Sequence, residues 1–239
     1  PQVNVASGEL AGFEALLRLK NHPLSPAVFI PVAEEIGLIH DIGRFVTREA
    51  IEQMNTWQAQ GLTLKPVAIN FSALQLNDVG YIDFLEEELN RNQIPASLLE
   101  VEITESIFME NKEDTLLFLH RLKELGVAIT IDDFGTGYSS LSYLTELPVD
   151  IVKLDKTLID RLLEADNQPM IESLVSLVHS LNLEVVAEGV EEVRQFKLLE
   201  ACGCDFVQGY LFSKPLPPAD ILDYFHADFR KSLHSPTTM

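Results

Sequence analysis

The chain has 239 residues, close to the ~250 residues that are typical of one closed α/β barrel. Its formal net charge of −20 argues against a protein that coats the nucleic-acid backbone, because that function needs a basic surface. A small phosphate ligand is compatible with this charge, since bound divalent cations can offset acidic groups. No uncharged stretch is long enough to span a membrane and no secretory leader is recognisable, so we expect a cytoplasmic protein without membrane contact.

Strand-like and helix-like segments alternate along most of the chain. Short, mostly β-branched apolar runs indicate strands buried on both faces, and amphipathic segments that end at glycine indicate helices. We expect strands at 12–17, 66–71, 98–103, 127–131, 150–154, 184–187 and 205–208. We expect helices at 27–36, 41–60, 80–92, 112–125, 192–201 and 218 to about 231, and one or two helices, broken near Pro169, within 159–181.

This alternation predicts the α/β class with a single parallel sheet. A further strand near the start would bring the seven strand candidates to eight, and eight strands close a barrel. An open doubly wound sheet is the alternative, but it usually has a glycine-rich turn after its first strand, which is not seen here.

Three expectations concern parts outside this pattern. The abrupt opening PQVN predicts a shortened first strand and a domain excised from a longer protein. Residues 232–239 are expected to be a frayed tail. Cys202 and Cys204, in CGC, have no second pair of ligands at zinc spacing, so we expect buried, reduced cysteines.

Two adjacent aspartates, Asp132 and Asp133, directly follow the apolar run VAITI at 127–131. Successive strand residues point to opposite sides, so one of the two carboxylates should face inward. A buried carboxylate is costly unless a positive group meets it. The pair therefore indicates a metal ion.

Polar residues also recur at the C-terminal ends of the other predicted strands. Such ends meet at one mouth of a parallel barrel, where active sites lie. Each residue alone is more often a solvated strand end or a turn former, but their recurrence predicts a single polar cavity. In chain order the residues are Glu14, Asn70, Glu102, Asp132 with Asp133, Lys153, Glu188 and Gln208.

The chemistry of this set suits hard cations. Oxygen ligands without histidine or cysteine favour Mg²⁺ or Mn²⁺ over zinc. Clustered carboxylates repel one another unless cations neutralise them. Two divalent ions about 4 Å apart form the clamp that is used in phosphodiester hydrolysis, and Lys153 is suited to orient the attacking water or to offset charge on the phosphate.

Seven ordered motifs resemble the EAL-domain phosphodiesterases of bacterial cyclic di-GMP signalling. They are GFEALLR at 12–18, NFS at 70–72, EVEITES at 100–106, IDDFGTGYSSLSYL at 131–144, PVDIVKLD at 148–155, VVAEGVE at 185–191 and GCDFVQGYLFSKPL at 203–216. The resemblance implies a modified (β/α)₈ TIM-like barrel with one antiparallel strand, which forms a single EAL phosphodiesterase domain over residues 1–239. It also implies hydrolysis of cyclic di-GMP to linear pGpG with two Mg²⁺ or Mn²⁺ ions.

The resemblance implies metal ligands residue by residue. Glu14, Asn70, Glu102 and Asp132 resemble the ligands of one ion. Asp132 bridges to the second ion, where Asp133 and water belong.

The resemblance implies further roles around the metals. Lys153 and Glu188 match catalytic residues that hold the water and the second ion, and Glu14 and Asp133 share in catalysis. On the substrate side, Arg18 matches a phosphate contact that suits the forked guanidinium group, Leu17 lies beside it in the motif, and Gln208 matches a polar residue near the water.

A glycine-containing loop at 134–140 has a role of its own in this family. It shapes the second metal site, and Glu105 resembles the glutamate that anchors it. The surrounding region 134–145 implies a homodimer contact. Sensory or cyclase domains of a parent protein, which could itself be anchored in a membrane, are the other implied partners.

Two other functions remain open. A catalytically silent receptor that binds cyclic di-GMP would share the fold, although silent members typically lose a metal ligand or degrade the 134–140 loop. A different metal-dependent barrel enzyme, such as a lyase acting on a carboxylate, would share the acidic cluster but would not need Arg18 or the loop.

Overall fold

The computed structural model describes residues 1–20, 22–108, 112–135, 144–164 and 167–233. Among these residues, eight strands follow one another in chain order in a closed hydrogen-bonded barrel, so the expected α/β barrel class is confirmed. Two compact units, residues 1–13 with 130–239 and residues 14–129, are described separately below. None of the described helices combines the length and the apolar composition that crossing a membrane requires.

The eighth strand lies in the first residues of the chain. β1 (Gln2–Asn4) runs antiparallel both to β2 (Leu10–Ala15) and to β8 (Phe206–Gln208), with Gln2 opposite Gln208. The turn between β1 and β2 forms because the Asn4 side chain accepts a hydrogen bond from the Ser7 amide at 2.8 Å. The one antiparallel strand that was expected is therefore β1, and although it is short, both of its edges are paired.

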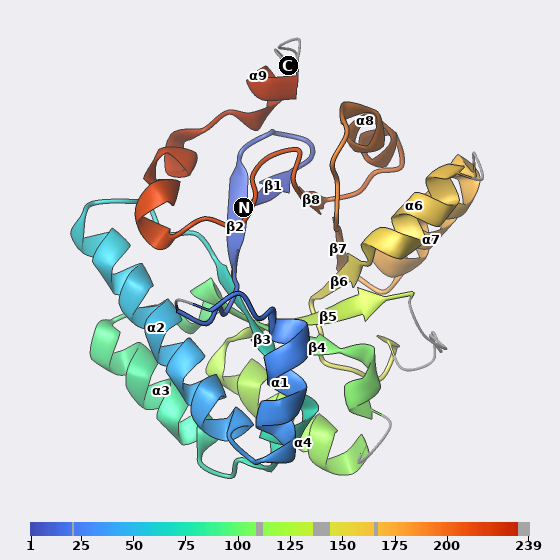
Figure 1. Ribbon diagram of the computed structural model, residues 1–239. Helices are drawn as coiled ribbons and strands as arrows, with labels where there is room; N and C mark the ends of the chain where they lie inside the picture. Colours follow the sequence, from blue (N-terminus) through green and yellow to red (C-terminus); the bar gives the residue numbers. More distant parts are fainter. Residues whose placement is uncertain (21, 109–111, 136–143, 165–166, 234–239) are drawn as a thin grey trace. The chain divides into compact units, whose positions relative to one another are not determined.

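The unit of residues 14–129 contains two paired parallel strands and the helices that follow them. β3 (Val67–Phe71) and β4 (Leu99–Thr104) pair in register, with Asn70 opposite Glu102. Phe71 packs against Phe118 and Tyr81, with ring centroids 5.3 and 4.9 Å apart. The helices are α1 (Pro26–Glu35), α2 (Ile39–Ala59), α3 (Tyr81–Asn92) and α4 (Lys112–Leu125), and α2 and α3 lie side by side (Figure 1). Short 3₁₀ segments precede α3, β4 and α4: η1 (Ala73–Asn77), η2 (Ala96–Leu98) and η3 (Glu105–Phe108).

The second unit carries the remaining parallel strands. β5 (Ala128–Phe134), β6 (Ile151–Leu154), β7 (Glu184–Ala187) and β8 are neighbours in that order. The helices α6 (Lys156–Glu164), α7 (Gln168–Ser180) and α8 (Val193–Ala201) follow β6 and β7. Pro169 lies in the first turn of α7, which explains the break expected there, since proline is tolerated at that position. Cys202 and Cys204 are buried free thiols, as expected, and burial raises the pKa of Cys204 to about 12.

The C-terminal segment differs from the sequence prediction. The single helix that was expected from 218 to about 231 is wrong, because η4 (Pro218–His226) is a 3₁₀ helix and α9 (Phe229–Leu233) is separate. Ala227 interrupts them with an extended backbone, and Asp228 then forms a β-bridge with Glu9. Ser232 and Leu233 still belong to α9, so the predicted tail does not begin at 232, and 234–239 lie outside the described residues.

We expect Gly209→Ala to destabilise the fold. A Cβ at this position would lie 2.2 Å from the Val190 carbonyl oxygen and 2.3 Å from its nitrogen, and backbone atoms cannot move aside cheaply. The expected loss is about 3 kcal/mol in the free energy of unfolding, measured by denaturant titration.

Gly203→Ala is the matched control. Gly203 has a left-handed φ of +77°, but its Cβ would have nothing within 4 Å, so this variant should lose only about 1 kcal/mol. Equal losses for the two variants would contradict the steric argument.

Candidate metal centre

Three carboxylates come together in the unit that contains β5 to β8. Asp132 and Asp133 lie on β5 and Glu188 directly follows β7, and each offers an oxygen within 4.8 Å of the others. Strand β6 lies between β5 and β7 in the sheet and carries Lys153. The acids that the sequence assigned to separate strand ends are therefore neighbours in space.

A β-bulge brings both aspartates into this cluster. Ile131 pairs with Val152 and Phe134 pairs with Leu154, so β5 uses one residue more than β6 over the same length. Asp132 is half-buried and Asp133 is exposed, which agrees with the expectation that one of the two carboxylates faces inward. The bulge places both carboxylates in one cluster.

Asp133 has a backbone conformation that is uncommon for a residue other than glycine. Its φ is +56°, in the left-handed region, and its amide donates a hydrogen bond to Asp132 Oδ1 at 2.9 Å. Such a conformation costs of order 1 kcal/mol and is concentrated at functional sites. Both observations indicate that the end of β5 gives up regular strand geometry and that its backbone instead fixes the positions of the two aspartate side chains.

Lys153 is buried between two of these carboxylates. Its side chain is 1% exposed, and Nζ lies 2.8 Å from Glu188 Oε1 and 3.2 Å from Asp132 Oδ1. A buried ammonium group is tolerated only when it is paired and hydrogen-bonded, and the two acids satisfy that condition. The lysine in turn fixes the two carboxylates relative to each other.

The charges of this cluster fit a divalent cation. Three carboxylates contribute −3 and Lys153 contributes +1, which leaves −2. All the anionic donors are oxygen atoms, which suit hard ions such as Mg²⁺ and Mn²⁺. Asp132, Asp133 and Glu188 are therefore the residues of this unit that could hold a metal.

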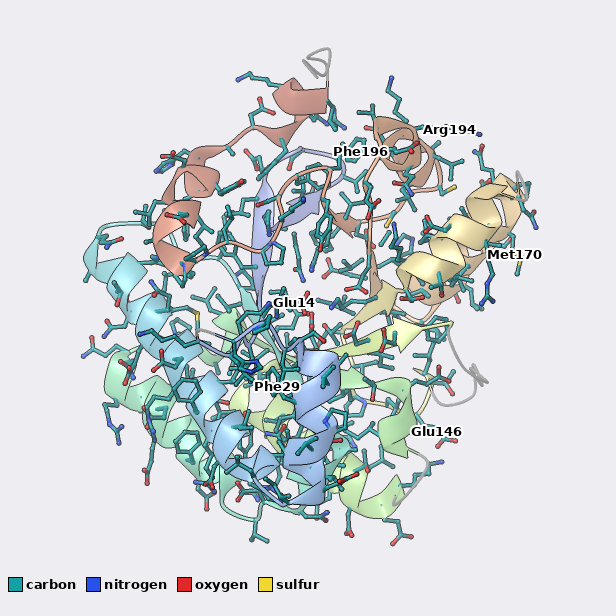
Figure 2. All side chains as sticks on the ribbon, viewed as in Figure 1. Glu14, Phe29, Glu146, Met170, Arg194 and Phe196 are labelled. Atoms are coloured by element: carbon teal, nitrogen blue, oxygen red, sulfur yellow. The ribbon has the colours of Figure 1, made fainter. Side chains whose placement is uncertain are left out.

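The unit of residues 14–129 presents a second set of the predicted ligands. Asn70 Nδ2 donates a hydrogen bond to Glu14 Oε1 at 2.9 Å, which turns the amide oxygen away from that carboxylate (Glu14 is labelled in Figure 2). Glu102 is the register partner of Asn70 on the neighbouring strand and is 1% exposed. A carboxylate so deeply buried, with an amide residue as its register partner, has the character of a cation ligand.

The structure places the other predicted residues as follows. Arg18 is exposed, and its Nη1 donates to the Leu17 carbonyl at 2.8 Å. Gln208 ends β8 and lines a hollow of about 300 Å³ together with Glu188. Glu105 begins η3 and is half-buried, but residues 136–140 of the 134–140 loop that it is expected to anchor lie outside the described residues.

Lys156 is a residue near the centre that the sequence did not single out. It lines the same hollow as Glu188 and Gln208, and Nζ lies 3.0 Å from Glu191 Oε1. The spacing of two lysines three positions apart, at 153 and 156, was visible in the sequence. The sequence did not show that Lys156 pairs with Glu191, because the two residues are distant in the chain.

The family model described as the EAL domain matches residues 1–215 of the chain. The chain belongs to the EAL domain family. Its sequence is 44% identical over 222 residues to the signaling protein YkoW of Bacillus subtilis, which covers 91% of the chain and 28% of YkoW. It is 40% identical over 227 residues to the bifunctional diguanylate cyclase/cyclic di-GMP phosphodiesterase MucR of Pseudomonas aeruginosa. This alignment covers 93% of the chain and 33% of MucR.

A solved structure shows the same fold as this EAL domain. The complex of the PaMucR phosphodiesterase with c-di-GMP superimposes with a TM-score of 0.85 at 40% identity, and the match covers 93% of this chain and 92% of that one. The chain thus spans nearly the whole of that solved chain but only about a third or less of YkoW and MucR.

We expect Asp133→Asn to weaken metal binding without weakening the metal-free fold. Asparagine tolerates the left-handed backbone as well as aspartate does, but it removes one negative charge from the cluster. Wild type should gain about 2.7 kcal/mol in the free energy of unfolding at Mg²⁺ or Mn²⁺ concentrations about 100-fold above Kd. The variant, at the same concentration, should gain at least about 1.4 kcal/mol less, corresponding to tenfold weaker affinity.

Denaturant titrations with metal and with EDTA measure both quantities. Asp228→Asn, which removes an exposed acid that pairs with Lys231 at 3.1 Å, is the control and should keep the full metal effect. The assignment of Asp133 fails if the Asp133 variant responds to metal as strongly as this control.

Proposed function

We propose that this EAL domain hydrolyses cyclic di-GMP to linear pGpG with the help of two divalent cations, Mg²⁺ or Mn²⁺. The observation that carries the proposal is the cluster of Asp132, Asp133 and Glu188 around the buried Lys153. Membership of the EAL domain family supports it, as do relatives named cyclic di-GMP phosphodiesterases. The solved phosphodiesterase in complex with c-di-GMP points to the same substrate.

The ligands are assigned to two ions in this proposal. Glu14, Asn70, Glu102 and Asp132 would be the ligands of one ion, and Asp132 and Asp133 would be ligands of the second. When bound, the ions polarise phosphate oxygens and lower the pKa of a coordinated water. Both units of the chain carry candidate ligands whose metal-binding atoms are oxygens, which supports the assignment of two hard cations.

The remaining residues act on the water and the phosphate. Glu188 accepts a hydrogen bond from the attacking water, and Lys153 fixes Glu188 in place and offsets charge that develops on the phosphate. The water oxygen forms a bond to phosphorus as the bond from phosphorus to one ribose oxygen breaks. The water gives up one proton and the leaving oxygen gains one, so the product is linear with a terminal phosphate.

Substrate binding is assigned to residues around this reaction centre. The forked guanidinium of Arg18 contacts the phosphate that is not cleaved, with Leu17 beside it. Gln208 lies at the hollow beside Glu188 and contacts the water. Glu105 anchors the 134–140 loop, which shapes the second metal site.

The wider setting is part of the same proposal. The domain functions in the cytoplasm, forms a homodimer through residues 134–145, and is controlled by sensory or cyclase domains of a longer protein. The larger size of the relatives supports the last point, since the chain spans 28% of YkoW and 33% of MucR.

The test is incubation of the purified chain with cyclic di-GMP, followed by chromatography of the nucleotides. We expect linear pGpG with Mg²⁺ or Mn²⁺ and none with EDTA. Glu14→Gln and Lys153→Met should each lower kcat by roughly 10²–10³-fold, because the first weakens binding of one ion and the second removes a positive charge that stabilises the reacting phosphate.

Lys231→Met is the matched control for Lys153→Met. Lys231 is 84% exposed and pairs with Asp228 on α9, so its loss should leave kcat within twofold of wild type. Tight binding of cyclic di-GMP without any product would reject the proposal and identify the domain as a receptor.

A further inference from the structure

The loop that carries Glu188 is fixed by backbone hydrogen bonds at alternate residues. Glu188 N donates to Leu154 O at 3.0 Å, which ties the loop to the end of β6. Val190 N donates to Gln208 O at 3.0 Å, and Val190 O accepts from Leu211 N at 2.9 Å, which ties it to the end of β8. Gly189 lies between these two anchored residues and Glu191 follows them. Among the described residues, neither forms a backbone–backbone hydrogen bond of this kind.

Lys156 contacts both of these residues. Its Nζ lies 3.0 Å from Glu191 Oε1 and 3.4 Å from the Gly189 carbonyl, and its third partner is Asp160 Oδ2 at 3.5 Å. A lysine ammonium has three N–H donors, so each donor has an oxygen partner. The ammonium is thereby committed to the loop and to helix α6.

Gln195 closes these contacts into a ring. Its Nε2 donates to Asp160 Oδ1 at 3.1 Å, and its Oε1 accepts from the Glu191 and Glu192 amides at 2.7 and 2.9 Å. Lys156, Asp160, Gln195 and Glu191 therefore form a continuous circuit between α6, the loop and the first turn of α8. A ring of this kind restrains the loop more than a single exposed ion pair, which is usually worth little.

Gly189 brings the lysine stem against the loop backbone. Its φ is +64°, and a Cβ there would lie 2.4 Å from Lys156 Cγ. The aliphatic part of Lys156 thus occupies the space that a side chain at 189 would need. The contact lies one residue from Glu188.

We propose that Lys156 is a positioning residue that holds loop 188–192, and with it the Glu188 carboxylate, from the partly exposed side. Lys153 holds the same carboxylate from the buried side at 2.8 Å. Lys153 lies near the end of β6 and Lys156 begins α6. The first lysine contacts Glu188 and the second contacts Glu191, so together they hold both ends of one short loop. The part of this inference that concerns catalysis rests on the proposed phosphodiesterase function, and the part that concerns the loop does not.

A direct contact between Lys156 and the substrate is the competing role. Lys156 lines the hollow with Glu188, Gln208 and Tyr210, and a phosphate would attract it. The full set of oxygen partners argues against that role. The hydrogen bond to Glu191 also raises the pKa of Lys156, so the charged, paired form is favoured.

The test compares Lys156→Met, Glu191→Gln and the double variant with Lys231→Met as control. Hydrogen exchange of the metal-free proteins is the first measurement, because it requires no activity. We expect exchange of the amides at 188–192 to be about tenfold faster in either single variant. The double variant should show no further increase, because both changes break the same ring, and the control should match wild type.

Kinetics with cyclic di-GMP and Mn²⁺ is the second measurement. We expect Lys156→Met to lower kcat about tenfold, to leave KM for cyclic di-GMP within twofold, and to raise the Mn²⁺ concentration needed for half-maximal rate. Unchanged exchange in loop 188–192 would overturn the proposal, and so would a tenfold higher KM with unchanged kcat, which would indicate direct substrate contact. If wild type makes no pGpG, the proposed function fails while the exchange experiment still decides the role of Lys156.

Discussion

The buried ammonium of Lys153, shared by Asp132 and Glu188, is the interaction on which the candidate centre depends. Neither acid could be held so close to the other without a cation between them, because like charges in a partly buried site repel strongly. Lys153 therefore offsets part of the repulsion between the two carboxylates that a metal ion would otherwise have to offset. It leaves a residual charge that matches one divalent ion, so the cluster is organised before any ion binds and still favours binding.

The bulge in β5 is the second requirement. A regular strand would direct Asp132 and Asp133 to opposite faces of the sheet, and only one could reach Lys153 or Glu188. The extra residue between Ile131 and Phe134, with the left-handed φ of Asp133, accompanies an arrangement in which both carboxylates belong to one cluster with Glu188. The strand gives up regular pairing at its end, which shows that local sheet stability is subordinate to the geometry of the carboxylates.

Much of this could be predicted from the sequence, and what could not has identifiable physical reasons. The apolar runs predicted β3 to β8, and the acids at their ends predicted the candidate ligands, since buried strands and isolated carboxylates are strong local signals. Strand β1 has three residues, too few to show a period, and the bulge depends on pairing with β6 rather than on the sequence of β5. The role of Lys156 depends on Gly189 and Glu191, which are 33 and 35 positions away in the chain. The role of the 134–140 loop still rests on the resemblance alone, because residues 136–140 lie outside the described residues.

The pairing of β1 has a mechanical consequence. Gln2, Val3 and Asn4 lie directly against Gln208, Val207 and Phe206, and Gln208 in turn accepts the backbone hydrogen bond from Val190 in the loop that carries Glu188. A shift of the first four residues would thus be passed along one strand ladder to the loop that carries Glu188. Displacement of this three-residue strand would leave an edge of β8 unpaired, so the position of the N-terminal segment is coupled to the loop at the candidate metal centre.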